Sequence, residues 1–598
     1  MRLATQRKTM KDAIDTSVLI VGAGPVGLAL AVELGWRGID CMVIDQDEGK
    51  FLLPRASGIS ARTMEFCRRW GIVDQVHAAG FPHDFGLDIV FCTSLTGHLV
   101  GRDVYPALRD LAPLEFSPEN KYRCPQHMFD PVLERAARAY PHVDIRRRCR
   151  LDGFVDTGEC VLATATVLEE GQTYSFDKDT AEAATEARSN SGPRIAIRAR
   201  HMVGCDGVNS SVREALGIGV DGNPALSYSI SALIDAPGLE MHHAMGDAER
   251  YIFIGPEGVW GNLTVVDGRG RWRLTIAGSE EKLDLKQFDM DAAVRRCLGG
   301  NDIPYRITLV TPWRRRQMVA RKLRKGRVFL AGDAVHAMSP TGGFGMSTGA
   351  GDSVDLGWKL EATLRGWGGA DLLDSYELER HPVAVRNTAA AADNFKPWKI
   401  RLDYSRVLEH STQATLDRQE IGTALVQAFK PEWETWGTTM GYRYENSPIC
   451  IPDGSAAYAD DSMVYAQSAR PGSRAPHAWL EDGRSTLDLF GRGFVLLRFG
   501  PATAETERLM AAAAKVKLPL EIVQIDQAAI ASLYRKRLVL VRPDGHVAWR
   551  GDELPDDAAH LIDLVRGQPA ARARPARVAP PNASVHDGRL PAVPSTPA

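Results

Sequence analysis

The sequence predicts an α/β protein with a Rossmann-type dinucleotide-binding domain, an inserted antiparallel-sheet domain and a C-terminal thioredoxin-like domain. Three stretches carry this prediction. Val18–Asp45 joins two buried apolar runs through a glycine-rich turn and a helical stretch, which is the pattern of a βαβ unit. Tyr228–Gly278 alternates apolar and polar residues between Gly and Pro turns, as antiparallel strands do. Ala469–Gly567 alternates strand and helix patterns, ends in a hairpin and contains no cysteine pair.

The first βαβ unit carries a dinucleotide fingerprint. Gly22 allows a tight turn, Gly24 lets the backbone approach a pyrophosphate, and Gly27 lets the helix pack close to the sheet. The helix N-terminus then presents N–H groups and a positive dipole to the phosphates. Asp45 ends the second strand, where it can accept hydrogen bonds from a ribose diol.

The composition excludes several classes of protein. A chain of 598 residues is too long for one core, which predicts about three domains. The net charge of −3 gives no electrostatic reason to expect nucleic acid or a membrane surface as a partner. The nine cysteines are scattered and form no CxxC, which indicates a reducing compartment and no metal cage. The basic N-terminus has no apolar run before Asp15, so we expect no signal peptide and a cytoplasmic location.

Two later segments repeat the order of strand, glycine-rich turn and helix. One buried strand ends in Asp206-Gly207 before a short helix. Another, Arg327–Ala331, is followed by Gly332-Asp333 and the glycine-rich loop 338–345, after which Met346–Arg365 is predicted to form a long helix. Both segments are therefore candidate ligand contacts.

Three further features have two interpretations each. Arg55 is either a solvated loop arginine or a cation close to a cofactor's phosphates. Gln126 is either a plain helix-start residue or a side chain that reaches a ligand across the first turn. The run 313–327 contains eight basic residues and is either solvated surface or a landing patch for a phosphorylated nicotinamide cofactor.

Together these motifs resemble those of the class A FAD-dependent aromatic hydroxylases, which have the para-hydroxybenzoate hydroxylase fold. The shared motifs are GxGxxG, Pro-Arg-Ala at 54–56, Gln126, Gly-Cys-Asp-Gly-x-x-Ser-x-x-Arg from 204, and Gly-Asp-Ala-x-His from 332 with its loop. The C-terminal unit and the segment 542–550 resemble the branch of phenol, hydroxyphenylpropionate and polyketide hydroxylases.

The resemblance implies a set of FAD-binding residues. The ADP half would be held by the fingerprint glycines and Asp45, the ribityl hydroxyls by Asp333, and the flavin pyrimidine ring would face backbone N–H groups at the helix start. Ser347 stands where relatives often have Asn. The full set is Gly22, Gly24, Gly27, Asp45, Arg55, Gln126, Asp206, Gly207, Asp333, Gly345, Met346 and Ser347.

The implied activity is that of a single-component flavoprotein monooxygenase. Such an enzyme binds FAD, takes NAD(P)H as co-substrate, uses no metal and hydroxylates a phenolic ring with O2 through a flavin C4a-hydroperoxide. The substrate pocket would be lined by Pro340, Gly342, Gly343 and Phe344. The catalytic group is unknown, with Tyr228, His243 and Tyr251 as candidates.

Other functions stay open at this point: an FAD-dependent oxidoreductase without oxygen insertion, a polyketide-tailoring oxygenase, or a flavin-binding protein without turnover. The expected partners are a small aromatic substrate and O2, without nucleic acid or membrane, and a homodimer is one candidate oligomeric state. The predicted domains are 14–85, 117–222 and 305–400 for FAD; 86–116 and 223–304 for substrate; 401–460 as a helical connector; 461–567 as the thioredoxin-like unit; and 568–598 as a disordered tail.

Overall fold

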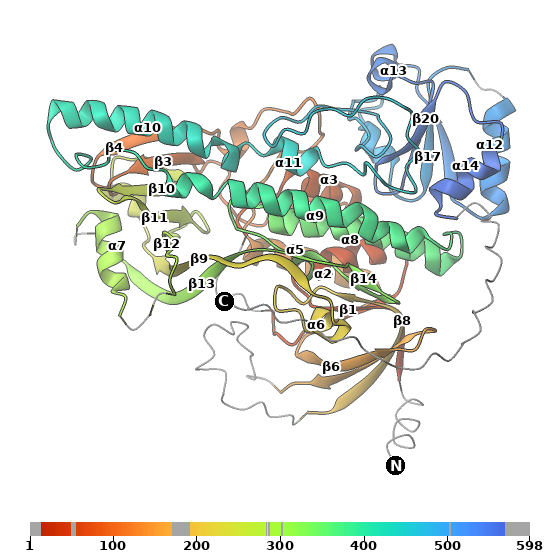
Figure 1. Cartoon of the computed structure of the whole chain (residues 1–598), viewed down its shortest axis with the longest axis horizontal. Helices are drawn as coiled ribbons and strands as arrows, with labels where there is room; N and C mark the ends of the chain where they lie inside the picture. The colour runs from red at the N-terminus through yellow and green to blue at the C-terminus, as the bar shows by residue number, and fades with distance from the viewer. Residues whose placement is uncertain are drawn as a thin grey trace, which may run out of the picture.

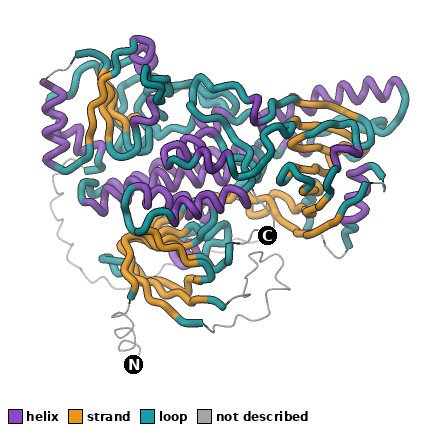
Figure 2. Tube along the Cα trace, turned by 180° about the vertical axis from the view of Figure 1, so that it is seen from behind, coloured by secondary structure: helices purple, strands orange, loops and turns teal. Residues whose placement is uncertain are grey.

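The computed structural model describes residues 13–49, 56–169, 192–282, 284, 287–300, 303–501 and 504–568. The described strands form three sheets, and two long helices, α8 (Phe344–Arg365) and α9 (Ser375–Asp393), run through the middle of the molecule (Figure 1). Seen from behind, the three groups of strands surround these helices (Figure 2). The segment 178–193 has almost no large apolar residues, which predicts an exposed hairpin loop. This segment and the tail predicted at 568–598 lie almost wholly outside the described residues.

The first sheet holds the predicted βαβ unit, with the strand order β14-β15-β8-β1-β2-β5. From β15 to β5 the neighbouring strands are parallel, so their carboxyl ends share one edge of the sheet. The strands β6 and β7 extend the sheet by antiparallel pairing onto β8. The bounds are β1 Ile14–Val21, β2 Cys41–Ile44, β5 Val143–Arg146, β6 Cys149–Asp156, β7 Val161–Val167, β8 Arg194–Gly204, β14 Arg324–Lys325 and β15 Val328–Leu330.

The second sheet has the order β16-β13-β9-β12-β11-β10-β3-β4 and is antiparallel except between β3 and β10. The chain enters it twice, for β3 and β4 between β2 and β5, and for β9 to β13 between β8 and β14, so it is inserted between strands of the first sheet. The short strand β16 then returns to it, which places the turn 332–335 between the two sheets. The bounds are β3 Asp88–Cys92, β4 Leu99–Asp103, β9 Val220–Asp235, β10 Ala248–Gly255, β11 Gly258–Val265, β12 Arg271–Ile276, β13 Arg306–Ala320 and β16 His336–Ala337.

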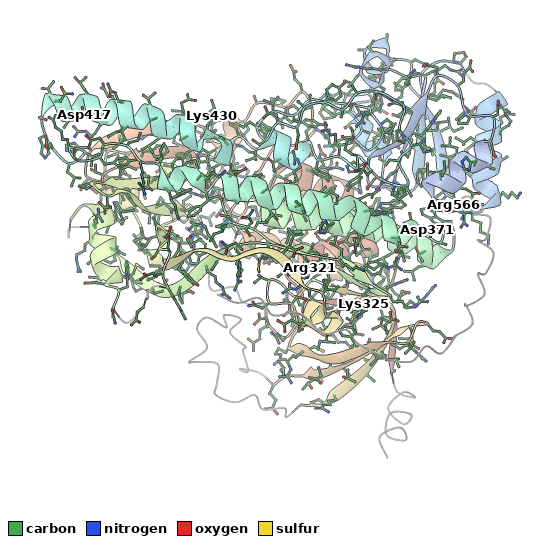
Figure 3. All side chains as sticks on the ribbon, viewed as in Figure 1. Arg321, Lys325, Asp371, Asp417, Lys430 and Arg566 are labelled. Carbon is green, nitrogen blue, oxygen red and sulfur yellow. The ribbon has the colours of Figure 1, made fainter. Side chains whose placement is uncertain are left out.

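The third sheet belongs to the C-terminal unit and has the order β18-β17-β19-β20, with β17 and β18 parallel and the rest antiparallel. Its last helix ends beside the turn that joins α8 to α9, where Asp371 N donates to Gly567 O at 2.9 Å; Figure 3 shows Arg566 next to Asp371. The bounds are β17 Phe494–Arg498, β18 Leu520–Gln524, β19 Leu538–Val541, β20 Val547–Gly551, α12 Ala504–Lys515, α13 Ala528–Tyr534 and α14 Ala558–Val565.

The helices follow their predicted signals at several ends and depart from them at one. The sequence predicts a helix that Ser60 caps and Gly71 ends. In the structure Ser60 accepts a hydrogen bond from Thr63 N at the start of α3, and Gly71 ends that helix with a left-handed backbone.

Pro382 in the sequence predicts that the helix starting near Asp371 is kinked or divided there. It is not divided, because α9 passes through Pro382. Buried ion pairs of Glu379 and Arg380 and packing against α8 hold the helix here. The other helices are α2 Pro25–Trp36, α3 Ala61–Trp70, α4 Val73–His77, α5 Gln126–Arg138, α6 Ser211–Leu216, α7 Met290–Leu298, α10 Thr412–Trp433 and α11 Trp436–Met440.

The C-terminal unit is joined to α8 and α9 by a buried charged group that we call the hairpin cluster: Asp355, Lys359, Glu379, Arg542 and Asp544. Arg542 lies 2.5 Å from Glu379, 2.7 Å from Asp544 and 3.1 Å from Asp355. Lys359 lies 2.8 Å from Asp355 and 2.5 Å from Glu379. Since Arg542 begins the turn between β19 and β20, this hairpin is fixed to the helix that follows the glycine-rich loop.

Candidate functional site

The turn after β1 has the geometry that a dinucleotide requires. Gly22 has φ +106°, and a Cβ there would collide with the carbonyl of Cys205. A Cβ on Gly27 would collide with the carbonyl of Gly22, whereas one on Gly24 would meet nothing within 4 Å. Gly24 precedes α2 without a side-chain cap, so the first N–H groups of α2 remain available to a phosphate.

Asp45 follows β2 and points back to this turn. Its carboxylate accepts hydrogen bonds from Ala23 N at 2.5 Å and from Asp47 N at 2.7 Å. The structure therefore brings Asp45 to the glycine-rich turn, at the edge where the sequence analysis placed it.

The Asp206-Gly207 motif lies against the same turn, because Cys205 N donates to Val21 O at 2.7 Å. The carboxylate of Asp206 accepts hydrogen bonds from Ser210 Oγ at 2.5 Å, from Ser211 Oγ at 3.0 Å and from a backbone N–H of α6. Its direct work in this structure is thus to fix the start of α6. Gly207 has φ +81°, and a Cβ there would meet nothing within 4 Å.

Asp333 lies between the two sheets, in the turn after β15. Its side chain is exposed among buried neighbours, and one of its carboxylate oxygens lies 3.8 Å from the place of a Cβ on Gly345. The turn is held from below by buried Asp352, which accepts hydrogen bonds from Gly332 N at 3.0 Å and from His336 Nε2 at 2.9 Å. Arg380 Nε donates to the other oxygen of Asp352 at 2.8 Å. These supporting residues were not predicted from the sequence.

The glycine-rich loop ends at α8, which starts two residues earlier than predicted. Gly342 and Gly343 have φ +87° and +68°, and Gly343 provides no side-chain cap to the helix. Phe344, a predicted pocket residue, is 1% exposed and packs beneath Gly342, so it supports the loop. Pro340 is exposed. In the first turn of α8, Met346 is buried and Ser347 Oγ accepts a hydrogen bond from Ser60 N at 3.4 Å.

Gln126 is the first residue of α5 and is held by a partner one turn along. Its side-chain amide donates to buried Asp130 at 3.1 Å. Burial raises the pKa of Asp130 to about 7, and the Gln126 hydrogen bond opposes that shift. Arg55 lies outside the described residues, so its two interpretations stay as predicted.

The three candidate catalytic side chains do not meet at the loop. Tyr251 is fully buried in the core beneath α7, its hydroxyl donates to Gly246 O, and its ring lies 5.5 Å from His243. Tyr228 sits on β9, where its backbone pairs with Ser279. The structure thus gives Tyr251 and His243 a packing environment on one face of the second sheet.

The opposite face of this sheet carries polar side chains on β9, β11, β12 and β13, beside an apolar part at Ile252 and Ile254. The pairing register aligns Arg250 with Thr264 and Arg273, and the next row aligns Asn262 with Thr275 and Ser231. Arg315 on β13 extends this face and donates to Ser227 Oγ at 3.1 Å and to Ser229 Oγ at 3.2 Å. The predicted solvated surface at 313–327 is therefore wrong for Arg315, which is 4% exposed.

Family models match most of the chain. A model described as FAD binding domain matches residues 15–179 and 166–391, and one described as aromatic-ring hydroxylase, C-terminal, matches residues 468–569. The chain belongs to the class A FAD-dependent aromatic-ring hydroxylases. It is an FAD-dependent monooxygenase of aromatic substrates, as the motifs predicted.

Individual relatives agree along the whole chain. Tetracenomycin B2 monooxygenase-dioxygenase of Streptomyces olivaceus is 32% identical over 94% of this chain and 100% of its own. The 2,4-dichlorophenol 6-monooxygenase of Cupriavidus pinatubonensis is 29% identical over 93% of this chain and 96% of its own. A solved structure of the rebeccamycin biosynthetic enzyme RebC with reduced flavin shares 38% sequence identity and a TM-score of 0.83 with this chain. The match covers 93% of this chain and 99% of RebC. Among the described residues, no helix has the length and apolar character needed to cross a membrane.

Proposed function

We propose that this enzyme binds FAD along the shared carboxyl edge of the first sheet and uses NAD(P)H and O2 to hydroxylate a phenolic ring. The observation that carries the proposal is the meeting of Asp333 with the uncapped start of α8, opposite the glycine-rich turn of α2. These three features match the parts of one FAD molecule. Asp333 suits the ribityl hydroxyls, the N-terminus of α2 suits the phosphates, and the N-terminus of α8 suits the flavin ring.

The residues present fit that cofactor. Gly24 and Gly343 leave open space beside two helix starts, which is the cradle that a dinucleotide needs. We assign the ADP half to the turn 22–27 and Asp45, the ribityl chain to Asp333 and Gln126, and the pyrimidine ring to the N–H groups of Met346 and Ser347. For Asp206 we assign an indirect role: it orients α6, while the backbone at Gly207 borders the cofactor.

When bound, FAD supplies hydride acceptance and oxygen activation. The chain's own part is electrostatic and steric. The uncapped N-terminus of α8 favours the negative charge that a reduced flavin carries. Asp352 and Arg380, both 1% exposed, fix the turn that presents Asp333. Between the loop 340–345 and the polar face of the second sheet, the protein must exclude water from the reacting ring.

The substrate is proposed to lie between Pro340, Gly342 and Gly343 on one side and the polar sheet face on the other. Neither Tyr251 nor His243 is on that face, so this proposal does not use them as a base. Its relatives act on a tetracenomycin and on a dichlorophenol, which favours both multi-ring and single-ring phenols as test compounds.

The finer division of the chain is also proposed. The parallel β17 and β18, the antiparallel β19 and β20 and the flanking helices α12–α14 support a thioredoxin-like fold for 461–567. The domain boundaries given from the sequence stay predictions.

A test of this function starts with the purified protein, which is expected to be yellow with about one FAD per chain. Phenols of one to four rings are then supplied with NADH or NADPH, and both nicotinamide consumption and product mass are measured. A product heavier by one oxygen atom supports the proposal. Reduced-nicotinamide oxidation that yields only a dehydrogenated product favours an oxidase or dehydrogenase instead.

A further inference from the structure

The C-terminal unit, residues 469–567, supplies no group to the proposed reaction. It contains no cysteine, so it cannot carry the dithiol or disulfide chemistry of a redox domain. Its part must therefore lie in its contacts with the rest of the protein. Those contacts include α8 and α9, which lie beside the unit in Figure 1, and α8 begins at the glycine-rich loop of the cofactor site.

Arg380 on α9 is the residue where these contacts meet. It is 1% exposed, and each of its three guanidinium nitrogens donates to a different acceptor. Nε donates to Asp352 at 2.8 Å, Nη2 to Thr348 O at 2.9 Å and Nη1 to Tyr444 Oη at 3.3 Å. Because a guanidinium is a rigid planar fork, the three acceptors together fix both its position and its rotation.

Two of these acceptors belong to the proposed flavin site. Asp352 holds the turn that presents Asp333 to the ribityl chain. Thr348 directly follows the two residues of α8 whose N–H groups are assigned to the flavin ring. The guanidinium of Arg380 therefore ties the ribityl contact to the ring contact.

The start of α8 has room for this guanidinium. A Cβ on Gly351 would lie 2.9 Å from Arg380 Nη2, so a larger residue there would displace the fork. A glycine weakens a helix interior, and here it allows Arg380 to approach the backbone of α8. Asn387 of α9 adds a second contact, because its side-chain amide donates to Thr348 Oγ1 at 2.9 Å. The start of α8 is thus held from α9.

The third acceptor, Tyr444, is held by the C-terminal unit. Its ring centroid lies 4.3 Å from that of His546 and 5.1 Å from the guanidinium carbon of Arg542. Both residues belong to the turn between β19 and β20, where Asp544 accepts a hydrogen bond from His546 N at 3.1 Å. Tyr444 is 3% exposed. Its hydroxyl therefore connects the C-terminal hairpin to Arg380 inside the protein.

We propose that Tyr444 is a positioning residue for bound FAD. Held by the C-terminal hairpin, its hydroxyl orients Arg380, and Arg380 sets the Asp333 turn relative to the start of α8. This inference rests on the proposed function, because it takes that turn and that helix start as flavin contacts. FAD must meet both at once, so a displacement of one relative to the other weakens binding. Reduced flavin should be more sensitive, since the N–H groups of α8 face its negative charge.

The experiment removes one hydroxyl and keeps the ring. In Tyr444→Phe, FAD is expected to bind about 3- to 10-fold more weakly than in the parent enzyme. The midpoint potential of bound FAD should become more negative, because the reduced form loses more affinity than the oxidised form. Fluorescence titration of the apoprotein measures the affinity, and reduction of the holoenzyme beside a reference dye measures the potential.

Two further variants assign the effect. Tyr442→Phe is the matched control, because the Tyr442 ring also lies beside Arg380, at 5.1 Å, while its hydroxyl interacts with Arg62. It should change FAD affinity less than about twofold and leave the potential unchanged. Arg380→Lys keeps the charge but removes the fork. In that background Tyr444→Phe should have less than about a twofold further effect on FAD affinity.

Each outcome decides for or against the inference. An unchanged potential in Tyr444→Phe overturns it, even if the apoprotein unfolds more easily. An equal shift in Tyr442→Phe, or an undiminished effect of Tyr444→Phe beside Arg380→Lys, also overturns it. If Arg380→Lys does not fold, the two phenylalanine variants decide.

Hydroxylation is measured separately, so that the proposed function is tested on its own. A Tyr444→Phe variant with parental affinity and potential that still hydroxylates its substrate overturns the inference alone. The expected changes in an enzyme that gives no oxygenated product support the positioning role and overturn the proposed reaction.

Discussion

The charges at the C-terminal hairpin and on the polar face of the second sheet are two buried groups built in different ways. In the hairpin cluster two cations meet three carboxylates, and Arg542 contacts all three within 3.1 Å. At the second sheet Arg123 pairs with Glu249 and Arg250 pairs with Glu432, with Arg273 and Arg315 on the same face. One arginine thus joins several carboxylates in the first group, whereas these two ion pairs of the second are one to one.

The pKa shifts follow this difference. Burial raises the pKa of Glu379, but Arg542 and Lys359 outweigh it and bring the value to about 2. Asp355, the carboxylate in excess, has a raised pKa because of its burial and can take up a proton. Burial lowers the pKa of Arg273 and of Arg315 to about 10. For Glu379 the attraction of its neighbours outweighs burial, whereas for Arg315 burial outweighs the attraction of Glu432.

The largest expected effect comes from breaking the matched cluster. Arg542→Met should lower the free energy of unfolding by about 3–5 kcal/mol, because it leaves buried carboxylates without their cation. Urea unfolding followed by circular dichroism measures the change. The control is Lys536→Met, which removes an exposed pair with Asp552 and should cost less than about 1 kcal/mol. Equal effects of the two variants would contradict the contrast.

Acid should weaken the same cluster without a mutation. The pKa of Glu379 is about 2 in the folded protein against 4.5 ordinarily, so its contribution to stability is fully present above pH 4.5 and is lost as the pH falls through 2. Asp544, also lowered, acts in the same direction, and Asp355 acts in the opposite one. Glu379→Gln should therefore flatten the decline of the unfolding free energy between pH 4.5 and 2. An unchanged slope argues against a matched cluster.

Asp333 and Asp352 can be compared by mutation. The first is an exposed carboxylate assigned to FAD binding, and the second is a buried carboxylate that stabilises the fold. Asp333→Ala should weaken FAD binding by about 1.5–3 kcal/mol, since it removes charge-assisted hydrogen bonds to the ribityl chain. Fluorescence titration of the apoprotein with FAD measures this loss. Unfolding of the apoprotein should be unchanged, whereas Asp352→Ala should destabilise it. If the Asp333→Ala apoprotein binds FAD as tightly as the parent, the assignment of Asp333 to the ribityl chain is wrong.

The sequence alone was sufficient for features that depend on local turn chemistry. The turn 22–27 with Asp45 and the segment from Gly332 to α8 were predicted because glycines and helix starts have short-range signatures. The support of Asp333 could not be predicted, since Asp352 and Arg380 meet it only through the packing of α8 and α9.

The second sheet shows the same limit of prediction from sequence. Alternation along β10 separates Tyr251 from Arg250 but does not tell which face meets the loop. Tyr251 was a candidate by residue type, although it is in phase with the apolar Phe253, and that signal could have assigned it to the core. Arg315 was hidden in a basic run, where the neighbouring Arg314 and Arg316 are half-buried and only Arg315 is buried.

Substrate binding beside the glycine-rich loop should also affect flavin reduction. Pro340–Gly345 joins that region to the start of α8, and its glycines permit a change of backbone conformation. A bound substrate is expected to accelerate reduction by NAD(P)H at least about tenfold, which requires about 1.4 kcal/mol of differential binding between two flavin positions. Anaerobic stopped-flow mixing with and without a hydroxylated substrate measures this. Equal rates would rule out gating by the substrate.

The smallest expected effect is the most informative about the comparison. Arg273→Met should change the free energy of unfolding of the apoprotein by less than about 1 kcal/mol or raise it, because the removed cation has two like-charged neighbours. The same urea unfolding, run beside Arg542→Met, provides the contrast. A loss near that of Arg542→Met would instead mean that partners within the protein stabilise the Arg273 cation as strongly as the hairpin cluster stabilises Arg542.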